Sequence, residues 1–417
     1  MAVPAIGSFV RRVLRHLARP ARENEGAEGL VVEPYRGYGS RQELYLMGRV
    51  YRQPGGRVRR ASGTGDLAAS LRRLLRRGAG DRTVIARFGS AEQRVVTDRR
   101  GYFHVHLPLP EPPPPDALWH RVSLHLELPS GATATATAEV FVPPERARFV
   151  VISDIDDTVM FTGVANKLQM FWRLFAQGAE SRLPFPGVGA LYRALHGREQ
   201  NPLLYVSRGP WSIYAMLEAF FQLNRIPIGP VLFLRDWGLS LCRPLPRRAR
   251  GHKLELIRRM LDLYGDLPFV LIGDSGQHDP ELYAQLVREH PGRVSAIYIR
   301  NVSRDPSRIE AIEALAREVI DAGSSLLLAS DSVVIAEHAA ETGLVPAHTP
   351  KLVAEDRRAT SGRTRRRPLR VLRLGTRRDT REAVEHGVLD RTLREPGGAP
   401  PNTLVEPDRD PDTAQRR

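Results

Sequence analysis

The residues best suited to chemistry lie in an acidic cluster, Asp154-Ile155-Asp156-Asp157-Thr158, directly after the apolar run Phe149-Val150-Val151-Ile152. Such a run, bounded by polar residues, predicts a buried strand of a parallel sheet. Carboxylates at its end need a metal ion or hydrogen-bonding partners, and open α/β sheets bind ligands outside the carboxyl ends of their strands. Asp154 and Asp156 face the same side if the extended geometry continues. For the cluster taken alone, a solvated acidic turn is the alternative.

Three later strand ends carry complementary residues. Ser207-Arg208-Gly209 follows an apolar run at 203–206 and offers a hydroxyl, backbone amides and a helix N-terminus suited to a phosphate. Lys253 opens a predicted helix and can neutralise phosphate oxygens. Gly273-Asp274-Ser275-Gly276-Gln277-His278-Asp279 follows the run at 269–272 with a second carboxylate pair. A Ser in such a place is usually a helix cap, but this order of residues at successive strand ends predicts one site, and oxygen ligands from Asp154 and Asp274 suit Mg²⁺.

The elements that must position these residues alternate as strand and helix through residues 146–350. That alternation of strands and helices predicts an α/β domain built on a doubly wound parallel sheet. From 31 to 145 the apolar period changes to two, and short strands separated by turn residues predict an all-β, sandwich-like domain. Asp98-Arg99-Arg100-Gly101 is predicted as a hairpin connection. His104, His106 and His125 alternate on these strands, and a solvated sheet face is the favoured interpretation over a metal site.

The two ends of the chain are basic. Residues 1–30 hold an amphipathic stretch, Ile6 to Leu17, interrupted by Arg, which predicts a helix that lies in a membrane interface or docks on its own protein. Residues 351–417 are predicted to be a disordered Arg-rich tail. From Arg357 onward it holds 16 Arg against 9 Asp plus Glu, a net charge of +7 within the total of +15. This excess favours an anionic partner: a membrane surface, an acidic protein or nucleic acid.

The chain has one cysteine, Cys242, which allows no intrachain disulfide and favours a reducing compartment. No segment approaches the length of an apolar spanning helix, and the N-terminal Arg residues interrupt any signal-peptide core. We therefore expect a cytoplasmic protein, peripheral on the inner membrane face if the basic segments engage it.

The motifs resemble the haloacid dehalogenase (HAD) superfamily of phosphohydrolases. More closely, they resemble the catalytic domain of the actin-patch-type phosphatidate phosphatases and their bacterial relatives. The matching stretches are Ser153-Asp154-Ile155-Asp156-Asp157-Thr158, Phe185-Pro186-Gly187-Val188, Tyr205-Val206-Ser207-Arg208-Gly209-Pro210-Trp211 and Ile272-Gly273-Asp274 to Glu281. Tyr35-Arg36-Gly37-Tyr38-Gly39 and Gly101-Tyr102-Phe103 resemble the upstream domain of those bacterial relatives. The Arg-rich tail departs from the pattern.

The resemblance implies roles for individual residues. Asp154 would be the nucleophile that forms an aspartyl-phosphate, and Asp156 the general acid and base. Mg²⁺ would be held by the Asp154 carboxylate, the Asp156 backbone carbonyl and Asp274. The transferring group would be bound by Ser207, Gly209 and Lys253, with Thr158 orienting the loop and Asp279 supporting the site from behind. Arg208 would either reach the phosphate or form a structural ion pair.

These observations predict a Mg²⁺-dependent phosphatidate phosphatase-like enzyme at the cytoplasmic membrane face. One alternative keeps the same chemistry for a soluble phosphomonoester or a phosphoprotein. Another is a non-catalytic membrane or nucleic-acid adaptor, which the intact set of clustered carboxylates disfavours. The aromatic segment Phe171, Trp172 and Phe175 is predicted either to pack the core or to face the lipid.

Overall fold

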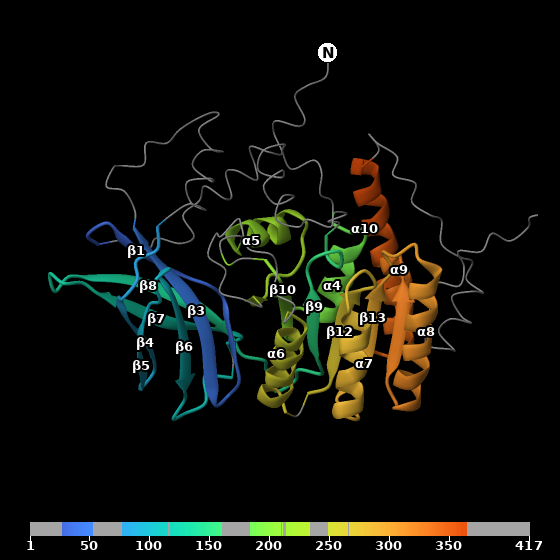
Figure 1. Cartoon of the computed structure of the whole chain (residues 1–417), viewed down its shortest axis with the longest axis horizontal. Coiled ribbons are helices and arrows are strands. Elements are labelled where there is room, and N and C mark those ends of the chain that lie inside the picture. The colour runs from blue at the N-terminus through green and yellow to red at the C-terminus, as the bar shows by residue number, and fades with distance from the viewer. Residues whose placement is uncertain are drawn as a thin grey trace, which may run out of the picture.

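The computed structural model describes residues 27–52, 77–115, 117–160, 184–209, 211, 214–233, 249–265 and 267–364. Figure 1 shows a β domain at one end of the long axis and an α/β domain at the other. This confirms the predicted order of an all-β unit followed by an α/β unit with a parallel sheet.

The β domain is a single eight-stranded sheet in the order β1-β3-β2-β8-β7-β4-β5, with β6 paired to β3. All pairings are antiparallel except that of β2 with β8. The strands are β1 (Leu30–Pro34), β2 (Gly37–Gly39), β3 (Glu43–Arg52), β4 (Thr83–Phe88), β5 (Ala91–Val96), β6 (Tyr102–Pro108), β7 (Trp119–Glu127) and β8 (Thr133–Phe141).

Alternation of apolar and polar residues builds the core of this domain. Along β7 the residues alternate between buried and more exposed, as a sheet with one apolar face requires. The buried side chains of β1, β3 and β6 meet those of β4, β7 and β8 in one hydrophobic cluster. The sheet therefore folds over so that its two halves enclose a common core.

The connection at residues 98–101 is a tight turn, but it is not a hairpin between paired strands. Gly101 has φ +85°, as its position in the turn requires. The strands it joins pair elsewhere: β5 with β4, and β6 with β3. The prediction of a hairpin is therefore wrong, because turn residues report a local change of direction and not the partner of each strand.

The α/β domain is a six-stranded parallel sheet in the order β11-β10-β9-β12-β13-β14. Its strands are β9 (Val150–Asp154), β10 (Leu203–Ser207), β11 (Val231–Phe233), β12 (Phe269–Asp274), β13 (Val294–Arg300) and β14 (Ser325–Ala329). The order reverses between β9 and β12, and such a switch point is where ligands bind in these sheets.

Helices cover both faces of the parallel sheet, which makes it doubly wound. The described helices are α4 (Val188–His196), α5 (Tyr214–Leu223), α6 (Ala249–Leu263), α7 (Asp279–Glu289), α8 (Pro306–Asp321), α9 (Ser332–Glu341) and α10 (Thr349–Thr364). One apolar cluster joins the sheet to α4, α5 and α9. A second joins the opposite face to α6, α7 and α8.

Two predicted boundaries are corrected. Helix α6 begins at Ala249, so Lys253 lies on its second turn instead of opening it. Helix α10 runs from Thr349 to Thr364, so residues 351–364 are helical and not part of a disordered tail. It packs against α4 and α9, with Val353 fully buried.

Several predicted segments lie outside the described residues. They are the N-terminal stretch 6–17, the aromatic segment 171–175 and the tail from 365 onward. Among the described helices, none is both long and apolar enough to span a bilayer.

Candidate active site

Lys253 joins two buried carboxylates at the switch point of the sheet. Its Nζ donates to Asp154 Oδ1 at 2.8 Å and to Asp279 Oδ1 at 2.6 Å. All three side chains are at most 2% exposed. Burial lowers the pKa of Lys253, but the charges of Asp154 and Asp279 outweigh it and raise that pKa well above its ordinary value. Lys253 is therefore a cation at every physiological pH.

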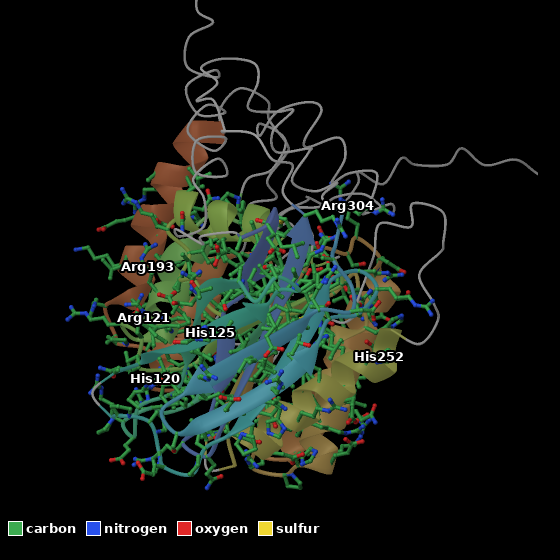
Figure 2. All side chains as sticks on the ribbon, turned by 90° about the vertical axis from the view of Figure 1, so that its left-hand side faces the viewer. His120, Arg121, His125, Arg193, His252 and Arg304 are labelled. Atoms are coloured by element: carbon green, nitrogen blue, oxygen red, sulfur yellow. The ribbon has the colours of Figure 1, made fainter. Side chains whose placement is uncertain are left out.

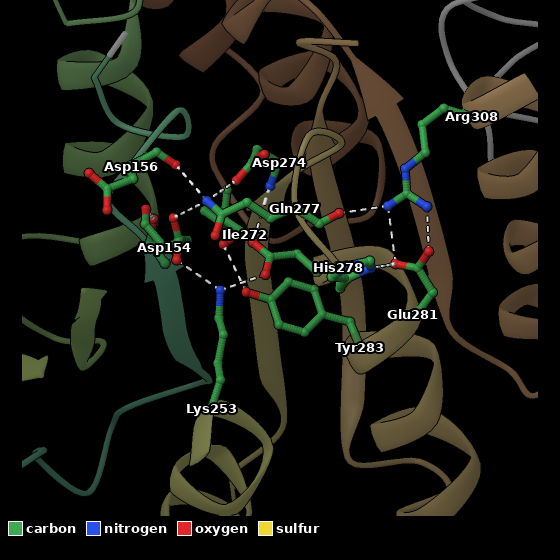
Figure 3. A network of polar contacts seen from close by, with 12 residues as sticks. Asp154, Asp156, Lys253, Ile272, Asp274, Gln277, His278, Glu281, Tyr283 and Arg308 are labelled. Carbon is green, nitrogen blue, oxygen red and sulfur yellow. Dashed lines mark hydrogen bonds and ion pairs between the residues drawn. The ribbon is translucent and has the colours of Figure 1, made fainter. Parts of the chain in front are cut away.

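Three oxygens converge on one nitrogen beside this ion pair. Gln277 Nε2 lies 3.2 Å from Asp154 Oδ2, 3.2 Å from the Asp156 backbone oxygen and 2.5 Å from Asp274 Oδ2. Figure 3 shows these contacts, with the Asp156 carboxylate directed away from the amide. The same three groups were predicted from the sequence as metal ligands. Because a donor at the meeting point of two carboxylates and a carbonyl occupies the place of a cation, these residues fit a hard divalent ion.

Three buried carboxylates come together here. One carboxylate oxygen from each of Asp154, Asp274 and Asp279 lies within 4.8 Å of the other two. Asp279 was predicted as a supporting residue, and its bond to Lys253 is consistent with that placement. Gly273 makes its approach possible, since a Cβ at that position would lie 2.4 Å from Asp279 Oδ2. The glycine thus allows the first residue of α7 to reach the end of β12.

The acidic loop after β9 is held by a buried arginine. Arg300, at the end of β13, donates from Nε to the Thr158 backbone oxygen at 3.1 Å and from Nη2 to Ser332 Oγ at 3.1 Å. Its guanidinium lies 4.1 Å from the centre of the Phe185 ring. Burial lowers the pKa of Arg300 to about 10, so the group stays charged. Thr158 Oγ1 is itself buried and without a hydrogen-bond partner among the described residues.

The segment 207–209, called the phosphate loop below, follows β10. Ser207 is 1% exposed, and its hydroxyl accepts a hydrogen bond from Gly209 N at 3.0 Å. The register pairs Val206 with Asp154, so this loop begins one residue beyond the acidic strand end. Arg208 Nε is buried and has no hydrogen-bond partner within the described part of the chain. Its two predicted targets, the phosphate and a structural ion pair, both stay predictions.

Sequence reasoning missed three residues that hold the site: Gln277, Arg300 and Arg308. On α8, Arg308 donates to the backbone oxygens of Ser275 at 2.9 Å and Gln277 at 2.6 Å. It also pairs with Glu281 (Figure 3). Gln277 stands inside a motif that was already singled out, so its position was a usable signal. The two arginines carry no such signal, because their roles depend on contacts distant in sequence.

Among the described residues, the histidines of the β domain belong to no group of three potential metal ligands. Figure 2 looks onto this domain and labels His125 and Arg121 on β7. His106 is exposed and its Nε2 lies 2.6 Å from Glu43 Oε2. Across the described residues, Asp154, Asp274 and Asp279 are the only group of three potential ligands. The solvated sheet face remains the better interpretation of these histidines.

Part of the α/β domain is similar to a known family. Residues 149–301 match the family model described as phosphatidate phosphatase APP1, catalytic domain. This stretch is therefore similar to an APP1-type catalytic domain. The matched stretch contains Asp154, Asp156, Ser207, Lys253, Asp274 and Asp279, together with Gln277.

Two curated relatives are similar to the chain. Phosphatidate phosphatase APP1 of Saccharomyces cerevisiae is 29% identical over 197 residues, covering 46% of this chain and 33% of the relative. An uncharacterized protein of Schizosaccharomyces pombe is 29% identical over 164 residues, covering 39% of this chain and 26% of the relative. The chain thus spans about a third or less of the length of the relatives it matches.

Solved structures add little to this assignment. A carbohydrate acetylesterase from Xanthomonas citri shares 12% identity with a TM-score of 0.25, covering 78% of this chain and 73% of that one. Tandem Ig repeats of Dlar share 12% identity with a TM-score of 0.17, covering 33% of this chain and 64% of that one. Both scores are too low to indicate a common fold.

Proposed function

We propose that this protein is a Mg²⁺-dependent phosphatidate phosphatase that works through an aspartyl-phosphate on Asp154. The observation that carries the proposal is the convergence of Asp154, the Asp156 carbonyl and Asp274 on a single point. Beside that point, Lys253 holds the other oxygen of Asp154. A fixed carboxylate next to a cation and a divalent-ion site suits the transfer of a phosphoryl group.

In the first step an oxygen of Asp154 attacks phosphorus, and the bond from phosphorus to the ester oxygen breaks. Asp156 gives its proton to the departing alkoxide. In the second step Asp156 takes a proton from a water molecule, and the hydroxide displaces Asp154 from phosphorus. Inorganic phosphate leaves, and both carboxyl groups return to their starting states. The Asp156 carboxylate is directed away from Gln277 (Figure 3).

Lys253 would hold Asp154 in position and offset negative charge as it develops on the transferring group. The amides of the phosphate loop and the guanidinium of Arg208 would bind the phosphoryl oxygens. Mg²⁺ would be held by Asp154, the Asp156 carbonyl and Asp274, and would supply Lewis-acid stabilisation of the phosphoryl oxygens.

Substitution of the nucleophile tests the chemistry. Asp154→Asn should abolish phosphate release, because a carboxamide cannot form the aspartyl-phosphate. Asp156→Asn should still form a phosphoenzyme with a good leaving group such as p-nitrophenol, but should fail with an alkyl phosphate. The measurement is phosphate release together with trapping of acid-stable phosphoprotein. Activity of Asp154→Asn near that of the wild type would refute the mechanism.

The lipid substrate is proposed from the family, and a soluble phosphomonoester is the competing outcome. A comparison of vesicle-embedded phosphatidate with soluble phosphate esters decides between them through their kcat/KM values. Collapse of phosphatidate hydrolysis alone in Phe171→Ser with Trp172→Ser would place that segment at the lipid. Equal loss on both substrates, together with lower thermal stability, would assign it to the core.

The basic tail would bring the enzyme to an anionic membrane surface. Each Arg near such a surface contributes about 1 kcal/mol, so a chain truncated after residue 364 should sediment less with anionic vesicles at low salt. Nucleic acid is the competing anion, since phosphate attraction is sequence-blind. Equal, salt-insensitive sedimentation of the full and truncated chains would refute this role.

A further inference from the structure

The turn between β1 and β2 leaves the core of the β domain and enters the catalytic domain. Tyr35 is 4% exposed and belongs to the apolar cluster of β9, α4 and α5, not to the β-domain core. Its ring stacks on Trp211 with centroids 4.9 Å apart and planes 13° apart. The Tyr214 ring lies 4.5 Å away on the same aromatic group. Tyr35 therefore packs against the start of α5.

Arg36 adds polar contacts to the same helix. Its backbone N–H donates to the Tyr214 hydroxyl at 2.9 Å, and that hydroxyl donates to Glu218 at 3.0 Å. The guanidinium forms an ion pair with Glu218 and a second, at 3.2 Å, with Glu139 of β8. The side chains of Arg36 and Glu218 are only 19% and 21% exposed. One arginine thus ties the first turns of α5 to the β domain.

The helix held in this way is the one that follows the phosphate loop. Trp211 is two residues beyond Gly209, and Tyr214 is the first residue of α5. Figure 1 shows α5 on the side of the catalytic domain that faces the β domain. The other strand-end loops are fixed from within the catalytic domain, by Lys253, Arg300 and Arg308.

We propose that the Tyr35–Arg36 turn is a positioning element for the phosphate loop, which makes the β domain part of the active-site support. This inference rests on the proposed function. Backbone amides bind a phosphate only when they are held at the correct place, and small displacements far from the reacting atoms reduce turnover strongly. The turn supplies that fixation through a ring stack and an ion pair instead of through contact with substrate.

The test uses the full chain with Mg²⁺ and two probes, inorganic phosphate and p-nitrophenyl phosphate. Tyr35→Leu keeps an apolar side chain but removes the stack. We expect it to raise the Kd for phosphate and the KM for the ester roughly tenfold. Amide hydrogen exchange should become faster in peptides from β10 to α5 and stay unchanged in β9 and β12. Tyr35→Phe keeps the ring and should restore wild-type values.

The matched control is Phe103→Leu, which removes a buried ring from the β-domain core. It should lower the thermal stability of the β domain and leave phosphate affinity and KM unchanged. Arg36→Met should shift the same quantities as Tyr35→Leu, whereas Arg94→Met, which breaks an exposed ion pair to Glu127, should not.

Two results with the variants would overturn the inference. Tyr35→Leu with unchanged Kd and KM would make the turn a plain domain contact. Equal losses in Phe103→Leu would mean that the loss follows general stability. Failure of the proposed function is a separate outcome. A wild type that binds phosphate but hydrolyses no ester refutes the proposed chemistry. The phosphate affinities of the wild type and the Tyr35 variants would then still decide the role of the turn. A wild type that does neither refutes both.

Discussion

Gln277 and a divalent cation need the same three oxygens, which gives a quantitative prediction. An ion held by Asp154, the Asp156 carbonyl and Asp274 at about 2.1 Å would occupy the space of the Gln277 amide nitrogen. Gln277→Leu removes the competing donor. Hydrogen bonds to charged groups contribute about 1.5–3 kcal/mol, so the variant should lose about 3 kcal/mol of unfolding free energy in EDTA.

The same free energy should reappear as cation affinity. If the loaded site does not use Gln277, the variant should bind Mg²⁺ up to about 100-fold more tightly, at 1.36 kcal/mol for each factor of ten. In EDTA its Tm should fall by roughly 6–12 °C, at about 2–4 °C per kcal/mol, and excess Mg²⁺ should restore it. Calorimetric titration and thermal melts measure the two quantities independently.

Gln285→Leu is the matched control, because it removes a glutamine that donates to Glu289 on the exposed side of α7. It should change neither quantity. Weaker Mg²⁺ binding in Gln277→Leu would refute the reasoning, since it would mean that the Gln277 side-chain oxygen is itself a ligand. An unchanged Tm in EDTA would mean that the amide contributes no net stability to the carboxylates.

Two further predictions concern buried charge. Lys253→Met leaves Asp154 and Asp279 without their shared cation, so chemical denaturation should show that the free energy of unfolding falls by about 3–5 kcal/mol, and phosphate release should be lost. Arg258→Met, which breaks an outer ion pair on the same helix, is the control. An equal loss of stability in both variants would contradict the prediction. Burial lowers the pKa of His338 from 6.5 to about 4. Between these two pH values the unfolded chain binds a proton that the folded chain excludes. The free energy of unfolding that the neutral His338 allows above pH 6.5 is therefore lost as pH falls to 4. His338→Gln should therefore flatten the fall in Tm over that pH range by the equivalent of at most ~3 kcal/mol. His348→Gln is the control and should not flatten it. Parallel curves of Tm against pH for the wild type and His338→Gln would contradict the prediction.

The parts of the site that the sequence predicted share a local signal. Each of β9, β10 and β12 is buried along its whole length, so each appears as an uninterrupted apolar run that ends in a polar group. Parallel strands of one sheet present their carboxyl ends at one edge. The convergence of Asp154, Ser207 and Asp274 follows from those two facts without knowledge of any contact.

The parts that were not predicted depend on contacts between distant segments. Helix α10 shows why: its sequence is mostly polar, and its fully buried apolar residue Val353 packs against Gly187 at the start of α4. A side chain at Gly187 would approach Val353 within 2.9 Å, so the helix fits because of a residue more than 160 positions earlier. No periodic signal within 351–364 carries that information.

Fixation of this site from two directions gives a physical reason for the presence of the β domain. The carboxylates are held by cations within the catalytic domain, because buried charges need partners wherever they lie. The backbone amides of the phosphate loop are neutral and need no such partner, so buried ion pairs do not by themselves fix their position. An aromatic stack and an ion pair from the β domain supply the missing constraint on α5. On this account, substitutions in the turn act on phosphate affinity, whereas substitutions of Lys253 or Arg300 act on stability and turnover together.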